Sequence, residues 1–74
     1  MNKNTEFDDL LKRISRNIKT YREKSGLTQM EMVNHGFNYR HYQRLEGGES
    51  GYNLLTLFRL SKVFKVEISS FFEG

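Results

Sequence analysis

Residues 27–46, with the sequence LTQMEMVNHGFNYRHYQRLE, decide the fold of this chain. Thr28 and Glu31 stand at the spacing of a capping box, in which the threonine hydroxyl bonds the amide of residue 31 and the glutamate carboxylate reaches back. Gly36 has no Cβ and can take the left-handed conformation that a tight turn between helices needs. Asn38 is a good N-cap for the residues that follow it. The stretch therefore predicts two short helices, over about 29–35 and 39–46, joined by a turn at the glycine.

Apolar spacing predicts a longer helix before this stretch. Over about 6–24, apolar residues recur at steps of three and four, which is typical of a helix with one buried stripe. Thr5, followed by Asp8, can cap the start of this helix, and Ser25-Gly26 supplies its stop. The stripe consists of Phe7, Leu10, Leu11, Ile14, Ile18 and Tyr21.

Two further helical segments are expected after residue 46. Gly47 to Gly51 form a glycine-rich loop, and Asn53 can cap a helix over 54–64. A last helical turn is expected over 68–72. No segment alternates with the two-residue period of a half-buried strand. The sequence therefore predicts an all-α fold of five short helices.

The same spacing assigns side chains to the core. Met32 and Val33 are expected to be buried in the second helix, and Tyr42 and Leu45 in the third. Phe37 is expected to plug the core between them. In the helix over 54–64, a rotation of 100° per residue places six residues on one inward face: Leu54, Leu57, Phe58, Leu60, Ser61 and Phe64.

Some apolar residues near the C-terminus fall outside that arc. Leu55 and Val63 do so, and with Ile68 and Phe71 (or Phe72) they suggest a second apolar surface. A two-fold dimer contact is the simplest use for such a surface. The alternative is a broad core within one small domain.

Length and composition limit the class of protein. A chain of 74 residues holds one domain, spanning 1–74, and its small core makes dimerisation a plausible source of stability. It has no cysteine, so it forms no disulfide framework. Apolar runs are too short to span a membrane or to serve as a secretion signal. We expect a soluble, cytoplasmic protein, and the initial Met1 favours a whole protein over a fragment.

Enzymatic and metal-dependent functions find little support in the sequence. No serine–histidine–acid set, phosphate-binding glycine loop or HExxH motif occurs, so no catalytic residue is assigned. His35 and His41 are the only histidines, and neither has a second ligand at metal spacing. We therefore expect no enzyme activity, no cofactor, no metal site and no small-molecule ligand.

The positive charge is concentrated in one segment. The net charge is +3, and residues 12–24 carry six lysines and arginines against a single acid, Glu23. Three acids precede this run, an order that suits a helix dipole. The run is therefore either a solvated helix face or the footprint of a phosphate-binding surface.

The pattern as a whole resembles the lambda-repressor/Cro-like, or Xre, family of helix-turn-helix DNA-binding domains. The resemblance covers about residues 14–72. It is carried by YREKSGLTQ at 21–29, YQRLEGG at 42–48, and NLLTL at 53–57 leading into VEISSFF at 66–72. The connection around residues 33–36 is one residue shorter than the family pattern. The resemblance implies a compact five-helix domain with the helix-turn-helix at helices 2 and 3.

The resemblance also implies roles for individual residues. Helix 3 would enter the DNA major groove and read bases through Asn38, Tyr39, Arg40 and Arg44. Contacts to the DNA backbone would come from Thr28, Gln29, His41 and Gln43. Glu46 is expected to be structural and to pair with a cation of the first helix such as Arg22. The dimer interface, expected from the apolar pattern and not from the resemblance, would include Leu55, Val63, Ile68 and Phe71.

These features favour a sequence-specific transcription regulator that binds an inverted-repeat operator in double-stranded DNA as a homodimer. Such a protein represses, or activates by touching RNA polymerase. Small phage Cro-like repressors and controller proteins of restriction–modification systems have this form. The alternative is an antitoxin or another protein-interaction module that acts mainly through a partner protein.

Overall fold

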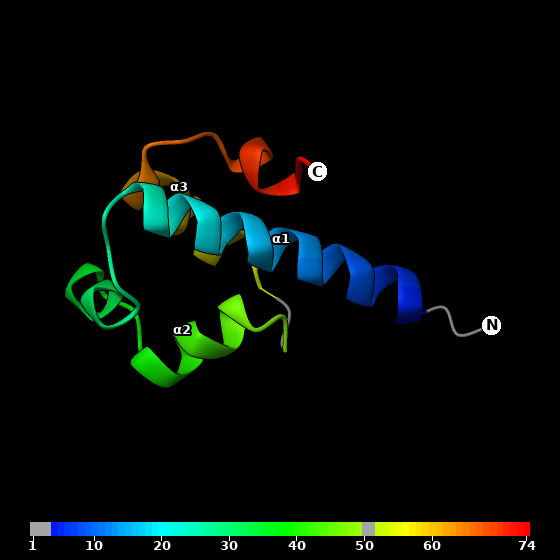
Figure 1. The fold of residues 1–74 in the computed structure, drawn as a ribbon, viewed down its shortest axis with the longest axis horizontal. Helices are drawn as coiled ribbons and strands as arrows, with labels where there is room; N and C mark the ends of the chain where they lie inside the picture. Colours follow the sequence, from blue (N-terminus) through cyan, green and yellow to red (C-terminus); the bar gives the residue numbers. More distant parts are fainter. Residues whose placement is uncertain (1–3, 50–51) are drawn as a thin grey trace.

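The computed structural model describes residues 4–49 and 52–74, and this part of the chain is helical without strands (Figure 1). It contains three α-helices and two 3₁₀ helices. The α-helices are α1 (Asn4–Lys24), α2 (Tyr39–Glu46) and α3 (Leu54–Phe64), and the 3₁₀ helices are η1 (Met30–His35) and η2 (Ile68–Phe72). The all-α class is confirmed. No helix in these ranges is long and apolar enough to cross a membrane.

Two of the five expected helices differ in type from the expectation. The segments η1 and η2 are 3₁₀ helices of six and five residues, not α-helices. Both segments contain backbone hydrogen bonds between residues three apart in the sequence. Examples are Met32 N to Gln29 O at 3.2 Å and Ser70 N to Glu67 O at 3.0 Å. Short helical segments often adopt 3₁₀ geometry, because a segment of this length contains few of the four-residue hydrogen bonds that stabilise an α-helix.

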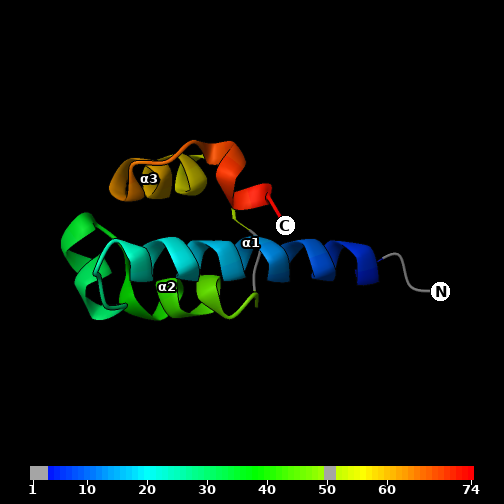
Figure 2. The same cartoon turned by 45° about the horizontal axis from the view of Figure 1, so that its top comes forward.

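The helix α1 runs through the middle of the molecule, with α2 on one side, α3 and η2 on the other, and η1 beside its C-terminal end (Figure 2). It begins at Asn4, two residues before the expected start, so Thr5 lies inside the helix and is not its cap. Its first turns project beyond the other elements (Figure 1). Phe7 was expected in the buried stripe, but it is exposed because no other element reaches that end of α1.

The local signals between the helices are confirmed. Glu31 N donates to Thr28 Oγ1 at 3.1 Å and Thr28 N donates to Glu31 Oε1 at 2.8 Å, which completes the capping box. Gly36 has a φ of +91°, in the left-handed region. Asn38 Oδ1 accepts from His41 N at 2.9 Å, and Asn53 caps α3 in the same way. Residues 50 and 51 of the expected glycine loop lie outside the described residues.

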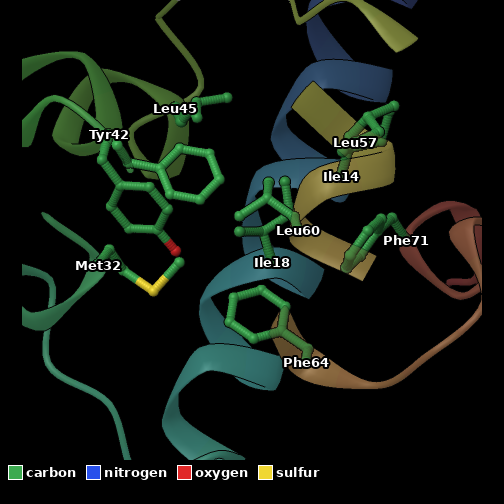
Figure 3. Packing of buried hydrophobic residues seen from close by; sticks show 10 residues of the cluster. Ile14, Ile18, Met32, Tyr42, Leu45, Leu57, Leu60, Phe64 and Phe71 are labelled. Atoms are coloured by element: carbon green, nitrogen blue, oxygen red, sulfur yellow. The ribbon is translucent and has the colours of Figure 1, made fainter. Parts of the chain in front are cut away.

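One core joins all five elements (Figure 3). Its buried apolar residues are Ile14, Ile18, Met32, Phe37, Tyr42, Leu45, Leu57, Leu60, Phe64 and Phe71. Phe71 from η2 is fully buried and packs edge-on against Tyr21, with ring centroids 5.9 Å apart, and against Phe64 at 6.3 Å. Phe71 is therefore a core residue, and its assignment to a dimer interface is wrong.

Three other burial assignments are also wrong. Val33 is exposed on η1, and of the two residues expected to be buried in this segment only Met32 points into the core. On α3, Leu54 is 71% exposed and Phe58 is 46% exposed. The residues of α3 that reach the core are Leu57, Leu60, Ser61 and Phe64, a narrower stripe than expected. Leu54 stands in the first turn and Phe58 at the edge of that stripe.

A polar cluster fastens the end of α2 to α1. Ser15 is buried on α1, and its Oγ donates to Leu45 O at 2.7 Å. The Ser15 hydroxyl also shares a hydrogen bond with the Tyr52 hydroxyl, which lies 3.3 Å from the carbonyl oxygens of Leu11 and Leu45. These bonds satisfy a carbonyl in the last turn of α2 and hold that end of the helix in place.

Candidate functional site

The outer face of α2 carries the side chains that the sequence singled out. Tyr42 and Leu45 are buried against the core, so the opposite face of this helix looks into solvent. That face displays four exposed side chains: Tyr39, Arg40, Gln43 and Arg44. The helix has eight residues and is therefore about 12 Å long at 1.5 Å per residue.

Arg40 and Arg44 lie one helical turn apart and share a shallow polar depression. Gln43 and Glu49 complete its lining. Glu49 comes from the segment after α2, where its backbone N donates to Arg44 O at 3.2 Å. The depression thus combines two guanidinium groups, which donate to planar or anionic acceptors, with one carboxylate. The sequence reasoning missed Glu49, because it stands in a loop that no local pattern places beside α2.

The remaining expected base-reading residues are partly engaged with the protein itself. Asn38 uses its Oδ1 as the helix cap, which leaves its Nδ2 group as the donor at the start of α2. The Tyr39 hydroxyl accepts a hydrogen bond from Gln43 Nε2 at 3.0 Å. His41 is exposed in the first turn of α2, on the edge away from Gln43.

Gln29, expected to contact the DNA backbone, is also bonded to α2 within the protein. Its Nε2 donates to Glu46 Oε1 at 3.0 Å, at the C-terminal end of α2. Its Oε1 lies 3.5 Å from Gln43 Nε2. Gln29 therefore links the residues before η1 to two turns of α2. The Thr28 hydroxyl accepts from Glu31 N at the start of η1 and remains exposed.

An ion pair anchors the end of α2. Arg22 Nε donates to Glu46 Oε2 at 2.6 Å and Arg22 Nη2 donates to Glu46 Oε1 at 3.1 Å, so the pair is bidentate. Arg22 Nη1 also donates to Leu27 O at 2.6 Å. The expected pairing of these two residues is confirmed. Because the Arg22 side chain is buried in this pair, it does not contribute to the exposed positive charge of α1.

The pKa values of this pair favour its charged form. Burial acts to raise the pKa of Glu46, but the hydrogen bonds to its carboxylate, first among them that from Arg22, outweigh burial and lower the pKa. The hydrogen bond to Glu46 raises the pKa of Arg22. The pair therefore holds the C-terminal turn of α2 against α1 as a fixed charged unit.

The expected dimer residues do not form one surface. Leu55 is 63% exposed, but Val63 and Ile68 are half-buried against the core of their own chain. The exposed apolar patch on α3 consists of Leu54, Leu55 and Phe58. The sequence reasoning missed Leu54 and Phe58 because the 100° period assigned both to the core.

Within the described ranges, no group of three or more histidine, aspartate or glutamate side chains is arranged to hold a metal ion. Comparisons with protein-family models, with curated proteins and with solved structures find no match to this chain.

Proposed function

We propose that this protein is a sequence-specific DNA-binding transcription regulator in which η1 and α2 act as a lambda-repressor-like helix-turn-helix. The observation that carries the proposal is the outer face of α2. An α-helix with its side chains is about 10–12 Å across and fits the DNA major groove, which is about 12 Å wide, and α2 presents two exposed arginines one turn apart on its outer face. Its inner face is held by buried side chains and its end by the Arg22–Glu46 pair. Such rigid support is what a reading helix needs.

In this proposal Arg40 and Arg44 read bases. A guanidinium can bond O6 and N7 of guanine together, and this is the commonest specific contact in the major groove. Asn38 Nδ2 and the Tyr39 side chain lie at the start of α2 and complete the base-reading set.

Four residues around the reading set would bind the DNA backbone: Thr28, Gln29, His41 and Gln43. Lys12 strengthens this arrangement. A Cβ on Gly48, in the turn after α2, would lie 3.5 Å from Lys12 Cγ, so the basic run of α1 approaches that turn. A cation there adds to the attraction for phosphates beside the groove.

The protein would bind as a homodimer through the exposed apolar patch of α3. Covering Leu54, Leu55 and Phe58 removes exposed apolar surface from water, which is favourable. A two-fold contact covers the same patch on both copies. Two reading helices about 34 Å apart would then meet an inverted repeat in successive turns of DNA. Repression and activation through RNA polymerase are both open to such a regulator.

The same patch supports one other function. If it faces a different chain, the protein is an antitoxin-like interaction module. The solution mass separates the two functions, because a concentration-dependent dimer supports the regulator and a monomer that gains order only with a partner supports the module.

The direct test is selection of bound sequences from a random duplex pool at about physiological salt, where non-specific charge binding is suppressed. An enriched inverted repeat supports the regulator and gives its operator. Failure to enrich any sequence, with the protein folded, would overturn the proposal.

Matched arginine variants then test the role of Arg40. Arg40→Ala should weaken binding to the selected site by about 1–3 kcal/mol and relax the preference at one base pair. Arg13→Ala is the control, because it removes the same charge from a residue beside Gly74, on the side of α1 away from α2. Equal losses for Arg40→Ala on selected and random DNA would make Arg40 a phosphate contact.

A further inference from the structure

Arg59 of α3 reaches across to the turn between η1 and α2. Its Nη2 donates to Gly36 O at 3.0 Å and to His35 O at 3.4 Å. Its guanidinium also lies over the ring of Phe37, with Cζ 4.5 Å from the ring centroid. A single side chain from α3 therefore contacts three consecutive residues of the turn.

The chemistry of the turn suits a guanidinium. The last carbonyl groups of a helical segment lack donors within it, and the partial negative charge at that end attracts a cation. The face of an aromatic ring attracts the same cation. Arg59 supplies both interactions at once, because its planar group can donate at its edge while its face covers the ring.

Gly36 is suited to this contact in two ways. Its φ of +91° is unfavourable for any residue with a side chain. In addition, a Cβ at this position would lie 2.7 Å from Arg59 Nη2, so a side chain would push the guanidinium off the turn. The glycine thus permits both the left-handed turn and the approach of Arg59.

The contact extends from the turn into α2. The buried ring of Phe37 packs edge-on against Tyr42, with centroids 5.8 Å apart and planes at 65°. Tyr42 is fully buried on the inner face of α2, between the two outward arginines in sequence. A shift of Phe37 would therefore move the surface on which α2 rests.

We propose that Arg59 is a positioning residue that sets the direction in which α2 leaves the turn, and so the alignment of Arg40 and Arg44 on DNA. This inference rests on the proposed function. Arg59 acts through Gly36 and Phe37 and makes no base contact itself. Its effect is on the discrimination between sequences, whereas a residue that binds phosphate affects all sequences alike.

The chain offers a matched control on the same helix. Lys62 is also exposed, and its ammonium lies over the ring of Phe58 at 5.1 Å from the centroid, in its own helix. Arg59→Gln and Lys62→Gln each remove one positive charge and one cation–ring contact. They differ in that only the first releases the turn. Arg59→Lys keeps the charge and loses the planar fork.

The first measurement is amide hydrogen exchange without DNA. Gly36 N donates to Val33 O at 3.0 Å and Phe37 N donates to Met32 O at 3.3 Å, so both amides report on the closed turn. We expect about tenfold faster exchange at both in Arg59→Gln, from the loss of a hydrogen bond and a cation–ring contact. Lys62→Gln should leave both rates unchanged. Unchanged rates in Arg59→Gln would overturn the inference.

The second measurement is binding to the selected sequence and to random duplex. In Arg59→Gln the ratio of the two affinities should fall about tenfold, the loss expected when the reading helix is misaligned by the opened turn. Its affinity for random duplex should match that of Lys62→Gln, and Arg59→Lys should recover only part of the ratio. An unchanged ratio despite faster exchange would refute the positioning role, and an equal extra loss on both duplexes would make Arg59 a phosphate contact.

If the unaltered protein selects no sequence, the proposed function and the positioning role both fail. The exchange rates then still decide whether Arg59 holds the turn.

Discussion

Replacement of Glu46 by glutamine tests what holds α2 in place. The Glu46 side chain is 3% exposed and its carboxylate accepts three hydrogen bonds, two from Arg22 and one from Gln29. Glutamine has nearly the same shape, but it offers one acceptor oxygen in place of two and carries no charge. In Glu46→Gln the Arg22 guanidinium stays buried without its counter-charge.

The expected loss of stability is large for a chain of this size. Removal of one partner from a buried ion pair costs about 3–5 kcal/mol. Because the glutamine oxygen can still accept from Arg22, we expect the lower end, about 3 kcal/mol. A domain of 74 residues at 0.05–0.15 kcal/mol per residue has a total stability of about 4–11 kcal/mol. The midpoint of thermal unfolding should then fall by roughly 12–24 °C.

Urea unfolding at pH 7, followed by far-ultraviolet circular dichroism, measures this loss. Glu67→Gln is the matched control, because Glu67 is exposed and makes no side-chain cap bond, so its replacement should change stability by less than about 0.5 kcal/mol. If Glu46→Gln lies within that same range of the unaltered protein, the ion pair does not anchor α2.

A double-mutant cycle isolates the pair itself. Arg22→Met and Glu46→Leu should each destabilise the protein, since each leaves one buried charge alone. The double variant contains neither charge and should be more stable than either single variant, which gives a coupling energy of at least about 1 kcal/mol. Additive losses would show that the two groups act independently.

Four other changes test separate parts of the structure. Tyr42→Phe should leave stability unchanged or raise it by up to about 1 kcal/mol, because the buried Tyr42 hydroxyl makes no hydrogen bond of normal geometry among the described residues; a loss above 1 kcal/mol in urea unfolding would show that this hydroxyl bonds the neighbouring Glu46 carboxylate. Asn38→Ala should cost about 1 kcal/mol by removing the cap of α2, and Asn38→Ser should restore most of it; equal losses would mean that the cap is unimportant. If the proposed dimer forms through α3, Leu55→Glu should shift the solution mass toward monomer at micromolar concentration with helical content intact, and an unchanged dimer mass would exclude Leu55 from the interface. Folding lowers the pKa of Glu46 below its ordinary value of 4.5, so the stability that this group contributes is present above pH 4.5 and is lost as the pH falls through the folded-state value. Between pH 5 and 3, the free energy of unfolding measured in urea should therefore fall more steeply in the unaltered protein than in Glu46→Gln. Parallel curves for the two proteins would contradict the lowered pKa.

The sequence by itself determined the features that depend on neighbouring residues. The capping box of Thr28 and Glu31, the left-handed turn at Gly36 and the cap at Asn38 each involve groups within four residues of one another. Their geometry follows from local covalent structure, so the start and stop of η1 and the start of α2 could be predicted. The outer face of α2 could be predicted for the same reason, because helical periodicity separates it from Tyr42 and Leu45.

Only the tertiary structure decided which apolar side chains are covered. Phe71 and Phe58 are equally apolar, yet Phe71 is enclosed by Tyr21 and Phe64 whereas Phe58 lies at the edge of the buried stripe of α3. Burial depends on which distant segments reach a position, and the period of one helix carries no information about them. For this reason the apolar patch of α3 was assigned partly to the wrong residues.

The contacts that hold α2 likewise join residues far apart in the chain. Gln29 meets Glu46 across 17 positions, and Arg59 meets Gly36 across 23. Arg59 stands in a helix whose local pattern marks it only as a solvated cation. Long polar side chains such as these can reach in many directions, and only the packing of α1, α2 and α3 around the core selects the partner that each one finds.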